Sequence, residues 1–292
     1  MADYSIWVVE YARVNEFARG LLLYGQWNTG TTIAPYCYAV LKSDDHLAVI
    51  DSGYNHVEFG KVLADSYGVS DWQPPEVVLG HLGFSPDDVD TLVLTHNHFD
   101  HAGGVEFFPN ARVYFQEREI SKYLWAVGLP DRLQWLTSAT DPDLMLWLVN
   151  RMKQGKLTLL SEETEILPGV RCIPAHDTHT AGSQYVTVEN ERDGKWVFAG
   201  DNAYVYENFT GANGDGRFTP IGLIFGSSER CVLTMEEMWQ HAGEEPSRIV
   251  PFHEQNLWTT FPSRQFDDSL HVAELSLAAG EPSRVDSALA TT

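Results

Sequence analysis

Cysteine is scarce in this 292-residue chain, and the three copies present, Cys37, Cys172 and Cys231, lie far apart in the sequence. They are odd in number and form no CxxC pair, so the sequence indicates neither a disulfide framework nor a zinc site built on paired thiolates. A chain with so few thiols suits a reducing environment. We therefore expect a cytoplasmic protein.

Positive charge is also in short supply, because 19 Lys and Arg residues stand against 41 Asp and Glu residues. The formal net charge of −22 repels the phosphates of nucleic acids and the headgroups of anionic lipids. We expect no nucleic-acid partner and no membrane partner. A nuclease would need a local basic groove, and the composition argues against one.

Long hydrophobic runs are absent as well. No stretch of about 18 apolar residues occurs, so the sequence predicts no membrane-spanning helix. The first residues, MADYSIWVVEYARV, contain Asp3 and Glu10 and have no basic segment ahead of an apolar one. This beginning does not resemble a secretory signal.

The chain does contain two halves that are rich in β signals. Apolar segments bounded by turn residues predict strands in the first half at 5–14, 36–43 and 46–53, and in the second half at 156–161, 164–175, 183–190 and 195–201. Helical patterns occur near 56–67, 118–127 and 233–242. Two strand-rich halves that are each followed by helices predict an α/β fold of the αββα type, in which two mixed sheets pack face to face with helices on both outer faces.

We expect a single domain at residues 1–265, with a helical insertion at about 119–155. The remaining segment, 266–292, is polar and rich in Ala and Ser, and we expect it to be a partly disordered tail. Residues 121–155 are rich in Trp, Leu and Met. These side chains could pack on the core, cover a pocket as a lid, or form the face of a homodimer.

The stretch THNHFDHAGG at 95–104 follows directly behind the apolar run TLVL. Side chains alternate along an extended segment, so His96 and His98 can point the same way and hold one cation. Asp100 and His101 in the turn that follows can reach a second cation beside the first. Imidazole nitrogen and carboxylate oxygen are ligands that zinc accepts. Four such groups within six residues predict a metal site.

Further ligand candidates stand beside or at the end of later predicted strands. They are His176, His179, Asp201 and His253. Each would be unremarkable alone, but together with the 95–104 motif they fit a centre of two metals. In such a centre Asp201 would bridge the two cations.

These residues resemble the pattern of the metallo-β-lactamase-fold hydrolase superfamily over roughly residues 35–255. The likeness consists of HxHxDH at 96–101, a downstream His, an Asp in a strand ending "GD", and a late His. The strand end "VIDSG" is similar to the Asp-Thr/Ser-Gly element of the superfamily, which places Asp51 next to the ligands. The resemblance implies one metal held by His96, His98 and His179, a second held by Asp100, His101 and His253, and Asp201 shared between them.

The choice of His179 over His176 also depends on this resemblance. The stretch HTAGSQYVTV is similar to the "H-T-P-G-H-Q-S" of the superfamily, with Ser183 in place of its second histidine. His176 stands where a Thr is usual. We expect His176 to contact the site from outside, and it remains the alternative ligand.

Within the superfamily the chain looks most like the N-acyl-homoserine lactonase-like branch, because "DNAY" with Asp201 and Tyr204 resembles its "D-x-x-Y". The resemblance implies a metallo-hydrolase with two divalent cations, most simply Zn²⁺, although Mn²⁺, Fe²⁺ or Co²⁺ would accept the same ligands. Hydroxide activated by the metals would open the ring of a small lactone or ester. Asp100 would carry the proton to the leaving oxygen, and the Tyr204 hydroxyl would contact the substrate carbonyl.

Other activities stay open at this point. A cyclic amide (lactam) hydrolase and a thioester hydrolase attack the same kind of carbon. A single-iron persulfide dioxygenase would use the same ligands, and a metal-binding protein without catalysis is the alternative of a different class. The segments 121–155 and 206–228 are predicted to build a pocket particular to this chain. The sequence therefore leaves the acyl and ring specificity undecided.

Overall fold

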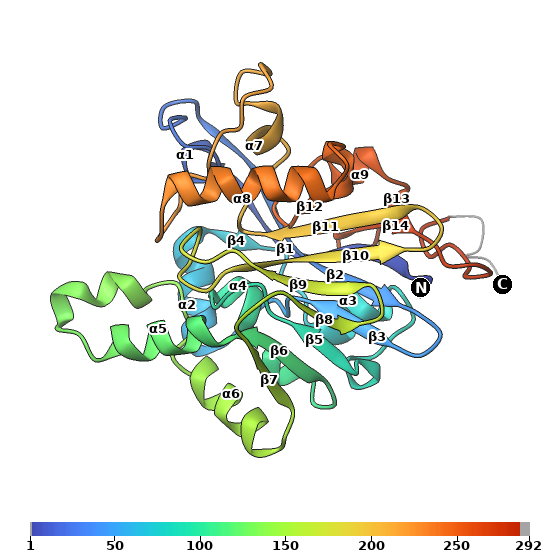
Figure 1. The fold of residues 1–292 in the computed structure, drawn as a ribbon, viewed down its shortest axis with the longest axis horizontal. Helices are drawn as coiled ribbons and strands as arrows, with labels where there is room; N and C mark the ends of the chain where they lie inside the picture. Colours follow the sequence, from blue (N-terminus) through green and yellow to red (C-terminus); the bar gives the residue numbers. More distant parts are fainter. Residues whose placement is uncertain (1, 287–292) are drawn as a thin grey trace.

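The computed structural model describes residues 2–286, and two β-sheets packed against each other form its centre (Figure 1). The strands of the larger sheet are β1 (Ser5–Ala18), β2 (Thr31–Lys42), β3 (Leu47–Ile50), β4 (Val69–Ser70), β5 (Thr91–Val93), β6 (Arg112–Gln116), β7 (Leu157–Leu160), β13 (Ser263–Gln265) and β14 (His271–Ser276). Those of the smaller sheet are β8 (Thr164–Leu167), β9 (Val170–Pro174), β10 (Gln184–Asn190), β11 (Gly194–Gly200) and β12 (Ile249–Pro251).

The larger sheet runs in the order β13-β14-β1-β2-β3-β5-β6-β7, with β4 paired to β1, and the smaller runs β12-β11-β10-β9-β8. Parallel and antiparallel pairs occur in both sheets. The strand β3 is parallel to β5, which is parallel to β6, and β11 is parallel to β12. Both sheets are therefore mixed, as the sequence predicted.

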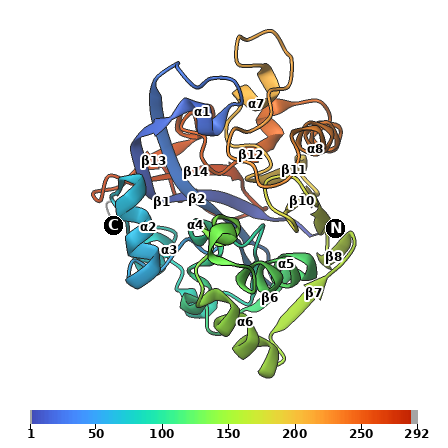
Figure 2. The same cartoon turned by 90° about the vertical axis from the view of Figure 1, so that its left-hand side faces the viewer.

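Helices cover the outer faces of both sheets. The α-helices are α1 (Arg19–Leu22), α2 (Glu58–Tyr67), α3 (Pro75–Gly80), α4 (Phe99–Ala102), α5 (Glu117–Val127), α6 (Leu144–Lys153), α7 (Glu207–Thr210), α8 (Ser228–His241) and α9 (Leu257–Thr260). Helix α8 lies along the smaller sheet, while α2, α3, α5 and α6 lie on the side of the larger one (Figures 1 and 2). This arrangement confirms the αββα architecture. Among the described residues, no helix has both the length and the apolar character that a membrane crossing requires.

Three layers of apolar side chains hold these elements together, and strand alternation assigns residues to them. In β1, Trp7 and Val9 face the helices of the larger sheet, whereas Ile6 and Val8 face the smaller sheet. In β11, Phe198 points between the sheets, and its neighbours Val197 and Ala199 pack with α8. Because successive side chains of a strand point to opposite faces, a strand buried on both sides is apolar at nearly every position.

The strand order also explains why polar side chains gather at one edge. Parallel strands end at the same side of a sheet, so the residues after β3 and β5 emerge together. The residues after β11 and β12 do the same in the smaller sheet. These four ends lead directly into Asp51, the 95–101 motif, Asp201 and His253. The fold thus brings segments as far apart in the sequence as Asp51 and His253 to one place.

The C-terminal segment differs from the sequence-based expectation. We expected residues 266–292 to form a tail, but His271–Ser276 form β14, which pairs antiparallel with β1. The polar residues of this segment meet polar partners inside the fold: Trp7 Nε1 donates to Glu274 Oε2 at 3.0 Å, and His271 Nδ1 lies 2.7 Å from Glu10 Oε2. The polar composition of this segment did not indicate a strand, because its Glu274 and His271 side chains find their hydrogen-bond partners on β1. Residues 287–292 of the expected tail lie outside the described residues.

The expected insertion at about 119–155 contains α5, the 3₁₀ helix η3 (Asp131–Thr137) and α6. One side of each α-helix packs inward, through Tyr123 and Ala126 of α5 and Leu144 and Leu148 of α6. Other apolar side chains face outward; Trp135 of η3, for example, is 59% exposed. The segment therefore both contributes to the core and exposes an apolar surface. A homodimer through that surface stays a prediction.

Substitution of Leu270 tests the contribution of the C-terminal segment. Leu270 is fully buried in the core on the helix side of the larger sheet. We expect Leu270→Ala to lower the free energy of unfolding by about 2–5 kcal/mol, because it leaves a cavity. The exposed Asp267 in the same segment provides the control, and Asp267→Ala should change the value by less than about 0.5 kcal/mol. Urea unfolding followed by circular dichroism measures both, and equal small effects would show that the segment does not belong to the folded core.

Candidate metal centre

The 95–104 motif begins just after β5 and includes the short helix α4. His96 and His98 lie in the loop between the two elements, and Asp100 and His101 lie in α4 itself. The helix ends at a close contact between main chains: a Cβ at Gly104 would stand 2.2 Å from the carbonyl oxygen of Ser52. The Ser52 amide in turn donates to the carbonyl of His101 at 2.7 Å. The glycines of the motif therefore let α4 lie against the loop after β3.

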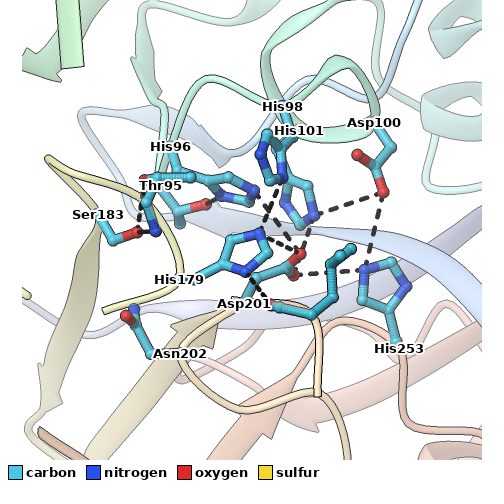
Figure 3. A network of polar contacts seen from close by, with 12 residues as sticks. Thr95, His96, His98, Asp100, His101, His179, Ser183, Asp201, Asn202 and His253 are labelled. Carbon is cyan, nitrogen blue, oxygen red and sulfur yellow. Dashed lines mark hydrogen bonds and ion pairs between the residues drawn. The ribbon is translucent and has the colours of Figure 1, made fainter. Parts of the chain in front are cut away.

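All seven side chains that the sequence analysis assigned to two metals converge in the structure (Figure 3). They form two groups, and within each group the ligand atoms lie within 4.8 Å of one another. All belong to residues that are at most 9% exposed. The first group is His96, His98, His179 and Asp201, and the second is Asp100, His101 and His253.

Asp201 stands between the two groups and directs one carboxylate oxygen to each. Its Oδ2 lies 3.6 Å from His96 Nε2 and 3.3 Å from His179 Nε2. Its Oδ1 lies 3.0 Å from His101 Nε2 and 3.3 Å from His253 Nε2. This is the arrangement that a carboxylate bridging two cations requires.

The spacing of these atoms fits divalent cations. Four ligands at about 2.0–2.2 Å around a tetrahedral ion stand about 3.3–3.6 Å from one another. The distances around Asp201 are close to that range, and those from Asp100 Oδ2 to His101 Nε2 and His253 Nε2 are 3.7 and 3.8 Å. Three of the buried atoms, His96 Nε2, His101 Nε2 and Asp201 Oδ1, have no hydrogen-bond partner among the described residues. Buried polar atoms without partners are costly, and cations at this place would supply what they lack.

Burial also prepares the first group for binding. It lowers the pKa of His96 and His98 well below the ordinary value and that of His179 to about 4. These imidazoles are therefore neutral near pH 7, the form that binds a cation. In the second group burial alone would lower the pKa of His101, but the carboxylates of Asp201, Asp100 and Asp51 outweigh it and raise the pKa well above the usual range. Their excess negative charge attracts positive charge to this spot.

Hydrogen bonds behind the cluster fix which ring nitrogen faces it. Asp51 Oδ2 accepts from His101 Nδ1 at 2.7 Å, and its two oxygens also accept the amide and the hydroxyl of Thr95. The Nδ1 atoms of His179 and His253 lie 2.9 Å from main-chain carbonyls. These contacts leave Nε2 directed at the cluster, as such partners of metal-binding histidines generally do. Asp51 thus lies where the family resemblance places it.

Two residues that the sequence analysis singled out lie beside the cluster. His176 is outside it, with Nε2 3.2 Å from Gln116 Oε1. Ser183 closes the loop after His179, since its hydroxyl oxygen accepts from the Thr180 amide at 2.9 Å. The structure therefore brings His179, and not His176, to the other ligand candidates.

Tyr204 is buried next to the cluster, with its ring against those of His179 and His253. With Asp100 and His253 it lines a cavity of about 30 Å³ that opens onto the cluster. Burial, followed by the charges of Asp201 and Asp100, raises the pKa of its hydroxyl well above 10. The hydroxyl remains protonated near neutral pH and can donate a hydrogen bond into the cavity.

The sequence analysis missed Glu119, which joins α5 to the loops that carry the first group. Its side chain is 1% exposed and accepts hydrogen bonds from the Thr180 hydroxyl and from the amides of Gly182 and Asn97. Asn97 stands between His96 and His98, and Thr180 follows His179. A signal was available, because Glu119 shares one helix face with Tyr123 and Ala126, at spacings of four and three residues. A carboxylate in such a stripe needs buried partners.

Substitution of Glu119 tests whether its hydrogen bonds position the two ligand loops. In Glu119→Gln, one carboxylate oxygen is replaced by an NH₂ group, which cannot accept a hydrogen bond from a main-chain N–H. At least one of the two main-chain hydrogen bonds is therefore lost, and we expect the ligand loops to loosen. We expect the affinity for the more tightly held cation to fall by about tenfold or more, as is usual when a group that orients ligands is changed. Competition with a chromogenic chelator measures it, and Glu117→Gln, on the exposed first turn of α5, is the control. Equal affinity in the two variants, with intact circular dichroism, would contradict the assignment.

Sequence relatives of the chain are N-acyl homoserine lactonases. The chain is 30% identical over 142 residues to N-acyl homoserine lactonase AiiB of Agrobacterium fabrum, a match that covers 49% of this chain and 50% of that protein. It is 27% identical over 132 residues to N-acyl homoserine lactonase AiiA of Bacillus thuringiensis subsp. kurstaki, which covers 45% and 46% of the two chains. The matched part thus spans about half the length of these curated relatives.

Solved structures show the same fold over most of the chain. An N-acyl homoserine lactone hydrolase with the product N-hexanoyl-L-homoserine at its catalytic metal centre matches with a TM-score of 0.66 and 18% identity, over 89% of this chain and 97% of that one. AidC, a dizinc quorum-quenching lactonase, matches with a TM-score of 0.62 and 15% identity, over 86% and 88%. At these identities the likeness concerns the fold.

The sequence pattern of the metallo-beta-lactamase superfamily matches residues 30–240, which is well over half of the chain. The match includes the 95–104 motif, His179 and Asp201, and the fold adds His253 from the strand end just beyond it. This match agrees with the two facing sheets and with the two groups of ligand candidates that the structure brings together. The chain belongs to the metallo-beta-lactamase superfamily.

Proposed function

We propose that this protein is a metal-dependent hydrolase that opens the lactone ring of N-acyl homoserine lactones. The observation that carries the proposal is the pair of buried ligand groups joined by Asp201 beneath a cavity lined by Asp100 and Tyr204. Two observations support the choice of substrate: the relatives named above are lactonases, and the "D-x-x-Y" residues Asp201 and Tyr204 lie together at this cavity.

The resident cations in this proposal are two zinc ions. His96, His98 and His179 would hold one, Asp100, His101 and His253 the other, and Asp201 would contact both. When bound, such a pair supplies Lewis acidity and makes coordinated water a nucleophile near neutral pH. Nitrogen-rich ligand sets such as this one suit zinc, and manganese, iron or cobalt would accept them too.

Asp100 is proposed to move the proton. Its carboxylate lines the cavity, and burial raises its pKa above the ordinary value. A carboxylate so placed can take a proton from the attacking water and deliver it to the ring oxygen as the C–O bond breaks. The alcohol and the carboxylate of the opened ring are the products.

Tyr204 is proposed to hold the carbonyl oxygen. Its ring lies against His179 and His253, with centroid separations of 5.7 and 5.3 Å, so it has little freedom to move away from the cluster. The protonated hydroxyl can donate a hydrogen bond to the oxygen as negative charge develops there. A fixed donor of this kind stabilises the transition state more than the bound substrate.

Two finer expectations stay with this proposal. A cytoplasmic location suits the three cysteines, which are all free and buried in the structure. A homodimer could use the exposed apolar side chains of α5 and η3, among them Trp125 and Leu133. A small-molecule lactone is the proposed substrate.

An Asp100→Asn variant tests the reaction. Because the amide cannot carry the proton, we expect kcat for an N-acyl homoserine lactone to fall by about 10²–10⁴-fold. Most of the metal should remain bound, since the other ligand candidates are unchanged. A pH-indicator assay measures kcat, and the metal content of the same protein is measured separately. The exposed Asp87 supplies the matched control, Asp87→Asn. Near-normal turnover in Asp100→Asn would refute the role of Asp100.

A Tyr204→Phe variant tests the hydrogen bond to the carbonyl oxygen. Removal of one such donor costs about 10²–10³-fold in kcat in other hydrolases, and we expect a loss of that order here. The metal content should stay constant, because the hydroxyl is not among the ligand candidates. A variant that changed only KM would indicate that Tyr204 contacts the substrate without stabilising the transition state.

A further inference from the structure

A second and larger cavity adjoins the one over the metal cluster. It has a volume of about 170 Å³ and is bounded by α5, by η3 and by the loops around residues 97, 140, 180 and 225. The two cavities share His98 and Ala139 in their walls. A ligand held at the cluster can therefore extend past His98 into this second space, which we call the side chamber.

Two polar side chains in the wall of the side chamber have no partner of their own. Asn97 is 7% exposed and Thr140 is 4% exposed, and neither side chain forms a hydrogen bond within residues 2–286. Asn97 lies between His96 and His98 in the sequence and, like His98, lines the side chamber. Both residues line the side chamber, so a ligand bound there can supply the hydrogen-bond partner that the protein does not.

The acidic groups around the side chamber already have partners. Glu119 accepts three hydrogen bonds from the protein, and Asp177 forms an ion pair with Arg118. The Lys122 ammonium lies 3.8 Å from the centroid of the Trp125 ring. The groups left free are the neutral amide of Asn97 and the hydroxyl of Thr140. They suit a neutral ligand with both a donor and an acceptor, such as a secondary amide.

The rest of the wall is apolar and limits the size of the ligand. Tyr123 and Ala126 of α5, Leu136 of η3 and Phe225 line it. Phe225 is held in place, since its amide donates to the His179 carbonyl at 2.9 Å and its ring stacks on Trp135 at 4.5 Å. A cavity of about 150 Å³ holds one benzene molecule, so the side chamber accepts a group of about six carbon atoms.

We propose that the side chamber binds the acyl-amide substituent of the substrate, with Asn97 as a specificity-determining residue that hydrogen-bonds to the amide. The inference rests on the proposed function and adds a substrate class to it, namely lactones with a compact, neutral N-acyl group of about six carbons. Longer chains exceed the volume of the side chamber and must leave it through its wall. Cationic substituents find no free carboxylate there, because Asp177 and Glu119 already have partners.

Kinetics with a graded set of substrates tests this inference. We compare γ-butyrolactone, which lacks the amide, with N-acyl homoserine lactones of four, six, eight and twelve acyl carbons. The wild-type kcat/KM should be highest at four to six carbons and at least tenfold lower at twelve. Asn97→Ala should lower kcat/KM for the six-carbon substrate about tenfold more than for γ-butyrolactone, through KM, because a buried hydrogen bond to the substrate is lost.

Two further variants complete the design. Leu136 is partly exposed, so Leu136→Ala should fold normally, widen the side chamber and raise the twelve-carbon rate relative to the six-carbon rate. Leu124→Ala, on the exposed face of α5, is the control and should match the wild type. Hydrolysis that is indifferent both to chain length and to the amide in all variants would overturn the inference while leaving the lactonase proposal intact.

A binding measurement covers the case in which no lactone is hydrolysed, which would refute the proposed function. Hexanamide, a neutral amide with a five-carbon tail, is titrated into metal-loaded protein and followed by calorimetry, with hexanoate and hexylammonium as charged counterparts. The side chamber should take up hexanamide in preference to both ions, and Asn97→Ala should weaken its binding about tenfold. Equal binding of the three compounds, or no effect of Asn97→Ala, would show that the side chamber does not recognise an amide.

Discussion

The convergence of buried imidazoles on one buried carboxylate is the interaction on which the rest of the structure depends. Asp201 offers one oxygen to His96 and His179 and the other to His101 and His253. Such a collection of buried lone pairs is costly on its own and becomes favourable only around cations. Two facing sheets make the collection possible, because strand ends from both of them open at the same edge.

The ligand candidates keep their positions because groups outside the cluster hold them. Asp51 holds His101 and Thr95 from the end of β3, and Glu119 holds both ligand loops of the first group from α5. Main-chain carbonyls hold His179 and His253. Each of these hydrogen-bonding groups is distant in the sequence from the ligand candidate that it orients. Preorganisation of this kind lets a metal centre bind its cations without distortion.

The helical segment at about 119–155 lies beside both the metal cluster and the side chamber. Helix α5 contributes Glu119 to the ligand loops and Tyr123 and Ala126 to the wall of the side chamber, so one helix contacts both places. The alternatives of core packing and a lid over a pocket are therefore not exclusive. The inward face of the insertion packs and lines a cavity, while its outward face remains exposed.

The sequence by itself determined the features that depend on the periodicity or the spacing of nearby residues. Alternation predicted most strands of both sheets, and the spacing of His96, His98, Asp100 and His101 predicted a metal site, because these patterns are set by the local geometry of the backbone. Tertiary structure alone decided which groups meet across the chain: the hydrogen bonds from Glu119 to both ligand loops, the free amide of Asn97 and the pairing of β14 with β1. These contacts depend on how separate elements pack, and no local pattern encodes the position of one packed element relative to another.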